Sequence, residues 1–75
     1  MPVEFSEHAK NQLKRRGISQ KLAREIVSNY DEIISSFRGR KLRRRQIGDK
    51  ILEVVTKTEG ERITVVTAYF LKEAK

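Results

Sequence analysis

Residues 41–71 read KLRRRQIGDKILEVVTKTEGERITVVTAYFL, and this stretch decides the fold. It contains three β-rich segments, at residues 41–47, 50–57 and 61–71, separated by Gly48-Asp49 and by Glu59-Gly60. A glycine beside an acidic residue between two such segments is typical of a tight hairpin turn. A fourth β-rich segment, residues 32–37, comes just before. The pattern therefore predicts four strands in an antiparallel meander.

Two helical segments precede the strands. Ser6 is a favourable N-cap for a helix that runs to about Arg16, and Gly17 suits the left-handed position that ends it. Ser19 is the N-cap of a second helix that runs to about Tyr30, and its apolar residues repeat with the spacing of a core-facing stripe. The short connection between the two predicts a tight helical hairpin.

These elements define the fold class. A chain of 75 residues makes one domain, so residues 1–75 are predicted to fold as a unit. We expect an α+β protein in which two N-terminal helices pack on one face of a four-stranded antiparallel sheet. Residues 3–5, which follow Pro2, are expected to be extended and can form a short N-terminal strand.

If both later turns are two-residue loops, the strand register follows by counting. Arg45 then faces Leu52, and Leu52 faces Thr67. Arg44 faces Glu53, which predicts a cross-strand ion pair of mainly structural importance. One face of the sheet is then predicted to hold Lys41, Arg43, Arg45, Leu52, Thr67 and Tyr69.

Most of the positive charge lies in one short segment. The chain has a net charge of +7, and six of the eight residues from Arg38 to Arg45 are basic. A localised excess of this kind indicates a polyanionic partner. There is no cysteine, no signal-peptide pattern and no apolar run long enough to span a membrane, so we expect a cytoplasmic protein with no membrane partner.

Arginine binds phosphate through two parallel hydrogen bonds and stays charged at neutral pH. The candidates for RNA or phosphate binding in this segment are Arg38, Arg40, Lys41, Arg43 and Arg45. Two alternatives stay open. The basic residues can protect a solvated edge strand from aggregation, or they can bind an acidic protein.

The candidates for proton chemistry are His8 and Tyr69. His8 is the only histidine, and it is either a general acid or base or a structural hydrogen-bonding residue. Tyr69 can stack on a base and transfer a proton, or it can be an amphipathic tyrosine at the edge of the core. Thr67 can donate to phosphate or simply fill a strand position, and Arg16 can bind phosphate or cap the first helix. A single histidine without cysteine predicts no metal site and no cofactor.

Several of these residues carry a family resemblance. Residues 5–9 (Phe-Ser-Glu-His-Ala), residues 16–19 (Arg-Gly-Ile-Ser), the basic strand and residues 65–69 (Val-Val-Thr-Ala-Tyr) resemble a family of short bacterial and archaeal proteins. That family carries a domain of unknown function and is grouped with the RelE and BrnT toxins of type II toxin–antitoxin systems. It often has arginine where this chain has Gln12.

The resemblance implies a RelE-like fold and an RNA-cleaving activity, on ribosome-bound mRNA or on free RNA, with a small acidic antitoxin as protein partner. Two functions follow as hypotheses. The first is a toxin-like RNA-binding protein that acts as a metal-independent endoribonuclease. The alternative is a non-catalytic basic module that binds nucleic acid or an acidic protein.

Overall fold

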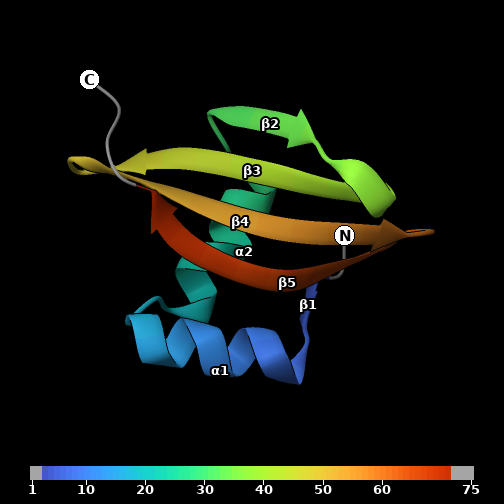
Figure 1. The fold of residues 1–75 in the computed structure, drawn as a ribbon, viewed down its shortest axis with the longest axis horizontal. Helices are drawn as coiled ribbons and strands as arrows, with labels where there is room; N and C mark the ends of the chain where they lie inside the picture. Colours follow the sequence, from blue (N-terminus) through green and yellow to red (C-terminus); the bar gives the residue numbers. More distant parts are fainter. Residues whose placement is uncertain (1–2, 72–75) are drawn as a thin grey trace.

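A computed structural model describes residues 3–71 of the chain. Two helices and five strands follow one another as expected for an α+β protein (Figure 1). In chain order the elements are β1 (Val3–Phe5), α1 (Glu7–Arg16), α2 (Gln20–Ser28), β2 (Glu32–Ser35), the 3-10 turn η1 (Phe37–Gly39), β3 (Arg40–Ile47), β4 (Lys50–Glu59) and β5 (Arg62–Leu71). None of the helices in this part of the chain has the length and apolarity that crossing a membrane requires.

The helix ends confirm the capping residues predicted from the sequence. The Ser6 hydroxyl accepts a hydrogen bond from the Ala9 amide at 3.0 Å, and the Ser19 hydroxyl accepts from the Leu22 amide at the same distance. Gly17 ends α1 in the left-handed conformation, with φ of 70°. The second helix ends at Ser28, two residues before the predicted end, because Asn29 has left the helical conformation.

The sheet has five strands and is mixed, so the prediction of four antiparallel strands is corrected. The strand order is β1-β5-β4-β3-β2. β1 pairs in parallel with β5, and Val3 and Phe5 pack against the core. The parallel pairing is possible because both helices lie between β1 and the rest of the sheet in the chain, which provides the crossover that parallel strands need. The basic strand β3 lies between β2 and β4 and is not a solvated edge.

The register between β3 and β4 is the predicted one, with Arg45 opposite Leu52 and Arg44 opposite Glu53. The register between β4 and β5 differs from the prediction by three residues, because Leu52 faces Phe70 instead of Thr67. The turn accounts for two residues of this three-residue difference in register. Gly60 has φ of 62° and takes the first loop position, which a type II′ hairpin reserves for glycine, so the loop is residues 60–61.

The third residue comes from a β-bulge. Thr56 pairs with Val65 but Val55 pairs with Thr67, which leaves Val66 as the extra residue of β5. Because side chains alternate along a strand, this odd shift turns the residues after Val66 to the other face. Thr67 and Tyr69 therefore share a face with Arg44, and the prediction that they share one with Arg43 was wrong.

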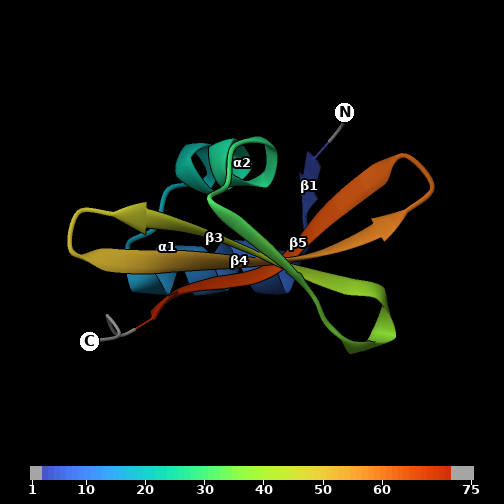
Figure 2. The ribbon, with the colours of Figure 1, turned by 90° about the horizontal axis from the view of Figure 1, so that it is seen from above.

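The core lies between the two helices and one face of the sheet. Its central side chains include Leu13 of α1, Ile26 of α2 and Leu52, Val54 and Val65 of the sheet, all of which are fully or almost fully buried. In Figure 1 the sheet stands in front of α2, and α1 runs along β5. Seen from above in Figure 2, α2 lies on one side of the sheet only. Neither helix packs on the opposite face of the sheet.

Candidate functional site

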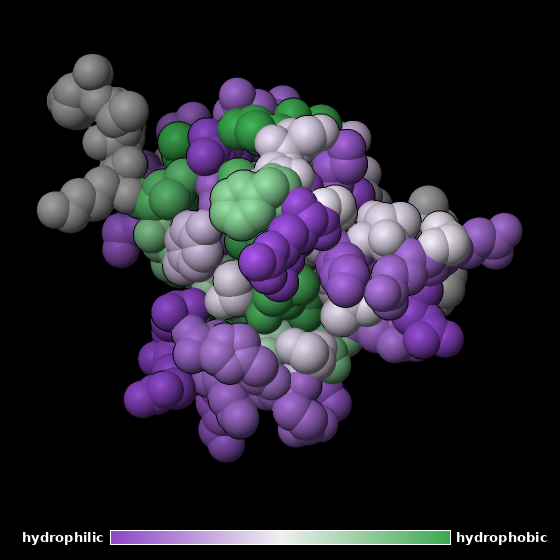
Figure 3. All heavy atoms as spheres, turned by 45° about the vertical axis from the view of Figure 1, so that its right-hand side comes forward, coloured by the Kyte–Doolittle hydropathy of each residue, from purple (hydrophilic) through white to green (hydrophobic). Residues whose placement is uncertain are grey.

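The uncovered sheet face carries an unusual mixture of side chains. Alternation along β3, β4 and β5 brings Arg44, Glu53, Thr67 and Tyr69 to this face, together with apolar residues such as Val55. Seen obliquely in Figure 3, the surface is made of apolar patches beside strongly hydrophilic side chains. A face of this kind offers both stacking surface and charge to a ligand.

A buried carboxylate lies in the middle of this face. Glu53 is only 2% exposed, although no described helix covers it. Its Oε1 accepts a hydrogen bond from Arg44 Nε at 2.6 Å, and its Oε2 accepts one from the Tyr69 hydroxyl. Arg44 also makes a longer contact of 3.9 Å with the exposed Glu32. The three side chains Arg44, Glu53 and Tyr69, here called the sheet-face triad, join three neighbouring strands.

The triad raises the pKa of its tyrosine. Burial raises the pKa of Tyr69 to about 12, and the hydrogen bond to Glu53 and the negative charge of that carboxylate act in the same direction. The positive charges of Arg44 and Arg16 oppose the shift. Tyr69 is therefore a neutral phenol at physiological pH whose hydroxyl donates to Glu53. It is a weaker acid than a free tyrosine, although still acidic enough to protonate an alkoxide.

Arg16 reaches this site from the end of α1. β1 pairs with β5 only from Ile63 to Val65, so the later part of the β5 edge has no neighbouring strand among the described residues. The Arg16 Nη1 donates to the Ala68 carbonyl at 3.0 Å and to the Thr67 hydroxyl at 3.3 Å. Its guanidinium carbon lies 6.0 Å from the centre of the Tyr69 ring. The structure thus brings together Arg16, Thr67 and Tyr69, three of the predicted site residues.

The basic residues of the segment 38–45, here called the basic cluster, are divided between the two faces of the sheet. Arg43 donates to the Val27 carbonyl in the last turn of α2 and lies over the ring of Tyr30. Arg45 forms an ion pair of 3.2 Å with Glu25 of the same helix. Both side chains are therefore on the helix side of the sheet, away from Tyr69, and both hold α2 in place.

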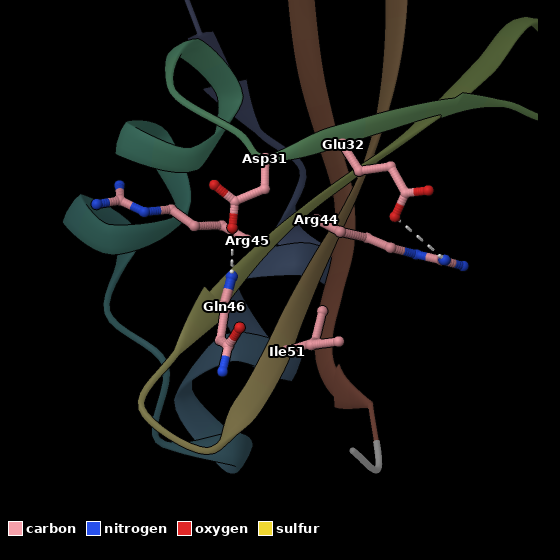
Figure 4. Close-up of a pocket in the computed structure, with 6 residues that line it drawn as sticks. All are labelled: Asp31, Glu32, Arg44, Arg45, Gln46 and Ile51. Atoms are coloured by element: carbon pink, nitrogen blue, oxygen red, sulfur yellow. Dashed lines mark hydrogen bonds and ion pairs between the residues drawn. The ribbon is translucent and has the colours of Figure 1, made fainter. Parts of the chain in front are cut away.

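A pocket of about 200 Å³ at the end of β3 shows this division. Figure 4 shows Arg44 and Arg45 leaving the strand in opposite directions, with Arg45 directed to the helix side. In the same view the Asp31 carboxylate accepts from the backbone N–H of Gln46 at 2.9 Å. The pocket is bordered by both charge signs, so it has no clear preference for an anion.

The other basic candidates lie near the opposite end of β3. Arg38 is exposed in η1 with φ of 63°, and Lys41 donates to the Ser35 hydroxyl at 2.8 Å. Arg40 is on the uncovered face, because every second residue of β3 points to the same face and Arg40, Leu42 and Arg44 are such residues. The cluster therefore leaves positive charge at the η1 end of the uncovered face.

His8 is not part of this site. It is exposed in the first turn of α1, whereas Arg16, the residue of α1 that meets Tyr69, is in the last turn. Eight residues of helix separate them by about 12 Å along the axis. The structure does not bring the two predicted proton-transfer residues together. In residues 3–71 no group of three or more His, Cys, Asp or Glu side chains is placed to hold a metal ion.

Two site residues were underrated by sequence reasoning. Arg44 and Glu53 were identified as a cross-strand pair, but their position beside Tyr69 depends on the bulge at Val66, which the sequence pattern does not reveal. The available signal was Glu53 itself, a lone acid within the apolar run of residues 51–55. A carboxylate at such a position needs partners on its own face.

Comparisons with known proteins place the chain in a family. Neither the comparison with curated proteins nor that with solved structures gave a match. One family model, described as "Domain of unknown function (DUF4258)", matches residues 5–70. This match includes both helices, β2 to β4, nearly all of β5 and every residue of the sheet-face triad. The chain therefore belongs to the DUF4258 family.

Proposed function

We propose that this protein is a toxin-like RNA-binding protein of the RelE and BrnT type, which holds single-stranded RNA across the uncovered sheet face. The observation that carries the proposal is the position of Arg16, whose guanidinium lies over the ring of Tyr69 and beside the Thr67 hydroxyl. An aromatic ring beside an arginine and a hydroxyl suits a base and its phosphate together.

The charge distribution supports this site. Tyr69 and Arg16 lie at one end of the face, and Arg40 lies at the other, close to the exposed Arg38. Between them are apolar and small polar side chains, including Val55 and Thr67. A nucleic-acid strand across the face would meet positive charge at both ends and stacking surface at one. Arg43 and Arg45 are excluded from these contacts because they hold α2.

The proposal includes metal-independent cleavage as its second step. The RNA's own 2′-hydroxyl would attack the phosphorus and give its proton to water, and the bond from phosphorus to the 5′ oxygen would break. The leaving 5′ oxygen would take a proton from the Tyr69 phenol, which regains one from water, while Arg16 would balance the growing negative charge. Such cleavage tolerates EDTA and leaves 2′,3′-cyclic phosphate ends. Because His8 is remote from Tyr69, we expect His8→Ala to change the rate less than tenfold.

Binding is tested by fluorescence anisotropy with a labelled, mixed-sequence RNA 12-mer. Arg16→Ala should weaken binding about 5- to 20-fold and reduce the slope of log K against log salt by about 0.7. The matched control is Arg24→Ala, since Arg24 also lies over an aromatic ring, that of Phe5, but on α2. Tyr69→Ala should weaken binding about 5-fold or more through lost stacking.

Two results would contradict the proposal. Equal effects of the Arg16 and Arg24 substitutions would show that RNA binding depends only on the total positive charge and that this face carries no specific site. Binding to polyglutamate but not to RNA would instead support the alternative, a non-catalytic module for an acidic protein such as a small antitoxin. Growth arrest on expression, relieved by Tyr69→Ala in a folded variant, would support the toxin function.

A further inference from the structure

The strand β2 ends the sheet and has an unpaired outer edge. It is the last strand in the order β1-β5-β4-β3-β2, and Figures 1 and 2 show no described element on its outer side. The Ser36 amide donates to the Arg40 carbonyl at 2.8 Å, which fixes the alternation of the ladder. The backbone groups of Glu32 and Ile34 therefore point to β3, and those of Ile33 and Ser35 point outward.

Exposed apolar side chains gather along this edge. Four large hydrophobic residues among those described are exposed, and three of them lie between residues 30 and 37: Tyr30 at 38%, Ile33 at 40% and Phe37 at 78%. Proteins usually protect a free edge with charge or with a covering segment, as Arg16 does at β5. A free edge with exposed apolar side chains, and with charge only at its ends, is typical of a strand that pairs with another chain.

The charges along the edge indicate which chain pairs with β2. Asp31 and Glu32 lie at the start of β2, whereas Arg38 follows its end. If two copies of β2 pair antiparallel, the acidic end of each meets the basic end of the other. A strand with opposite charges at its ends is complementary to itself in this orientation, as a two-fold symmetric interface requires.

We propose that β2 is a self-association edge, through which two copies of the chain pair antiparallel to form one continuous ten-stranded sheet. In the register centred on Ile34, Ile33 faces Ser35 of the second copy and the two Ile34 residues face each other. Glu32 then lies opposite Ser36 of the second copy, next to the turn η1 that carries the exposed Arg38. This interface lies at the opposite edge of the sheet from β5 and Tyr69, and it shares only Arg38 with the proposed RNA site.

The strength of the pairing follows from the size of the edge. β2 has four residues, so the interface is smaller than those of permanent dimers. We therefore expect a dissociation constant between about 10 µM and 1 mM, with dimers that exchange rapidly. Sedimentation equilibrium of the full chain over the same concentration range measures it directly.

Two sets of variants test the edge. Ile33→Asp should weaken dimerisation at least tenfold, whereas Phe70→Asp, at an equally exposed residue of β5, should leave it unchanged within about threefold. Arg38→Glu should also weaken it, and adding Glu32→Lys to Arg38→Glu should restore it, because the reversed pair is again complementary. Circular dichroism confirms that each variant is folded.

A protein that stays monomeric at 1 mM would overturn the proposal. So would equal effects of the Ile33 and Phe70 substitutions, or a double charge reversal that is weaker than Arg38→Glu alone. If a chemically unrelated acidic protein pairs with β2 while the chain itself remains monomeric, the edge belongs to that partner and the self-association is refuted.

Discussion

The strongest test of the uncovered sheet face is the removal of its central carboxylate by Glu53→Ala. Glu53 accepts hydrogen bonds from Arg44 and Tyr69, and it is almost completely buried. The substitution leaves the guanidinium of Arg44 and the hydroxyl of Tyr69 without their acceptor. It therefore tests whether a polar network, and not apolar packing, holds this face together.

The expected cost is worked from the two broken contacts. Removing one partner of a buried ion pair costs about 3–5 kcal/mol, but the side chain of Arg44 is 31% exposed and water replaces part of the loss. The unsatisfied tyrosine adds about 1 kcal/mol. We expect a total of about 3 kcal/mol. A domain of 75 residues has a stability of about 4–11 kcal/mol, so the substitution would remove between about a quarter and three quarters of it.

Urea denaturation followed by circular dichroism measures the change. The matched control is Glu4→Ala, which removes an acid from the exposed pair with Arg62 at 3.5 Å and should cost less than about 0.5 kcal/mol. Replacing both members of the inner pair, Arg44→Met with Glu53→Leu, should recover most of the stability, because no charge is then left unpaired. A cost for Glu53→Ala no greater than that of the control would refute this account.

Three further predictions follow from the same structure. Arg43→Ala should lower the free energy of unfolding by about 1–2 kcal/mol through the lost contacts with Val27 and Tyr30, and should leave the salt slope of RNA binding unchanged, as denaturation and anisotropy would show. Because the pKa of Tyr69 is raised to about 12 from 10, the folded state prefers the neutral phenol. The free energy of unfolding should therefore fall as the pH rises from 10 to 12, by no more than about 2 kcal/mol. Denaturation curves of Tyr69→Phe should lack this pH-dependent component. Gly17→Ala should cost about 1 kcal/mol in the same assay, since φ is 70° there and the added methyl group meets no other atom within 4 Å.

The local structure was largely predictable because it depends on short-range chemistry. The caps at Ser6 and Ser19, the helix end at Gly17 and the register across Gly48-Asp49 are each determined by a few adjacent residues. β1 was harder to assign, because its pairing partner is about 60 residues away. No periodicity within three residues can reveal such a contact.

The position of Tyr69 could not be predicted for a different reason. Its face depends on its register with β4. The loop position moves that register by two residues, which keeps the face, and the bulge moves it by one more, which changes the face. Type II′ geometry places Gly60 first in its loop, a rule that the sequence could have supplied. The bulge at Val66 carries no local signal, because valine fits a regular strand equally well.

The division of the basic cluster limits what its charge can do. Alternation along β3 sends Arg43 and Arg45 to α2 and Arg44 to Glu53. Lys41 also donates to the Ser35 hydroxyl, so four of the six basic side chains already have partners within the fold. The two that meet acids, Arg44 and Arg45, contribute little net field at the surface. The positive charge left for an external partner lies mainly at the η1 end of β3 and at Arg16. A count of charges along the chain therefore overstates the binding surface, and the two remaining positions define where a polyanion can be held.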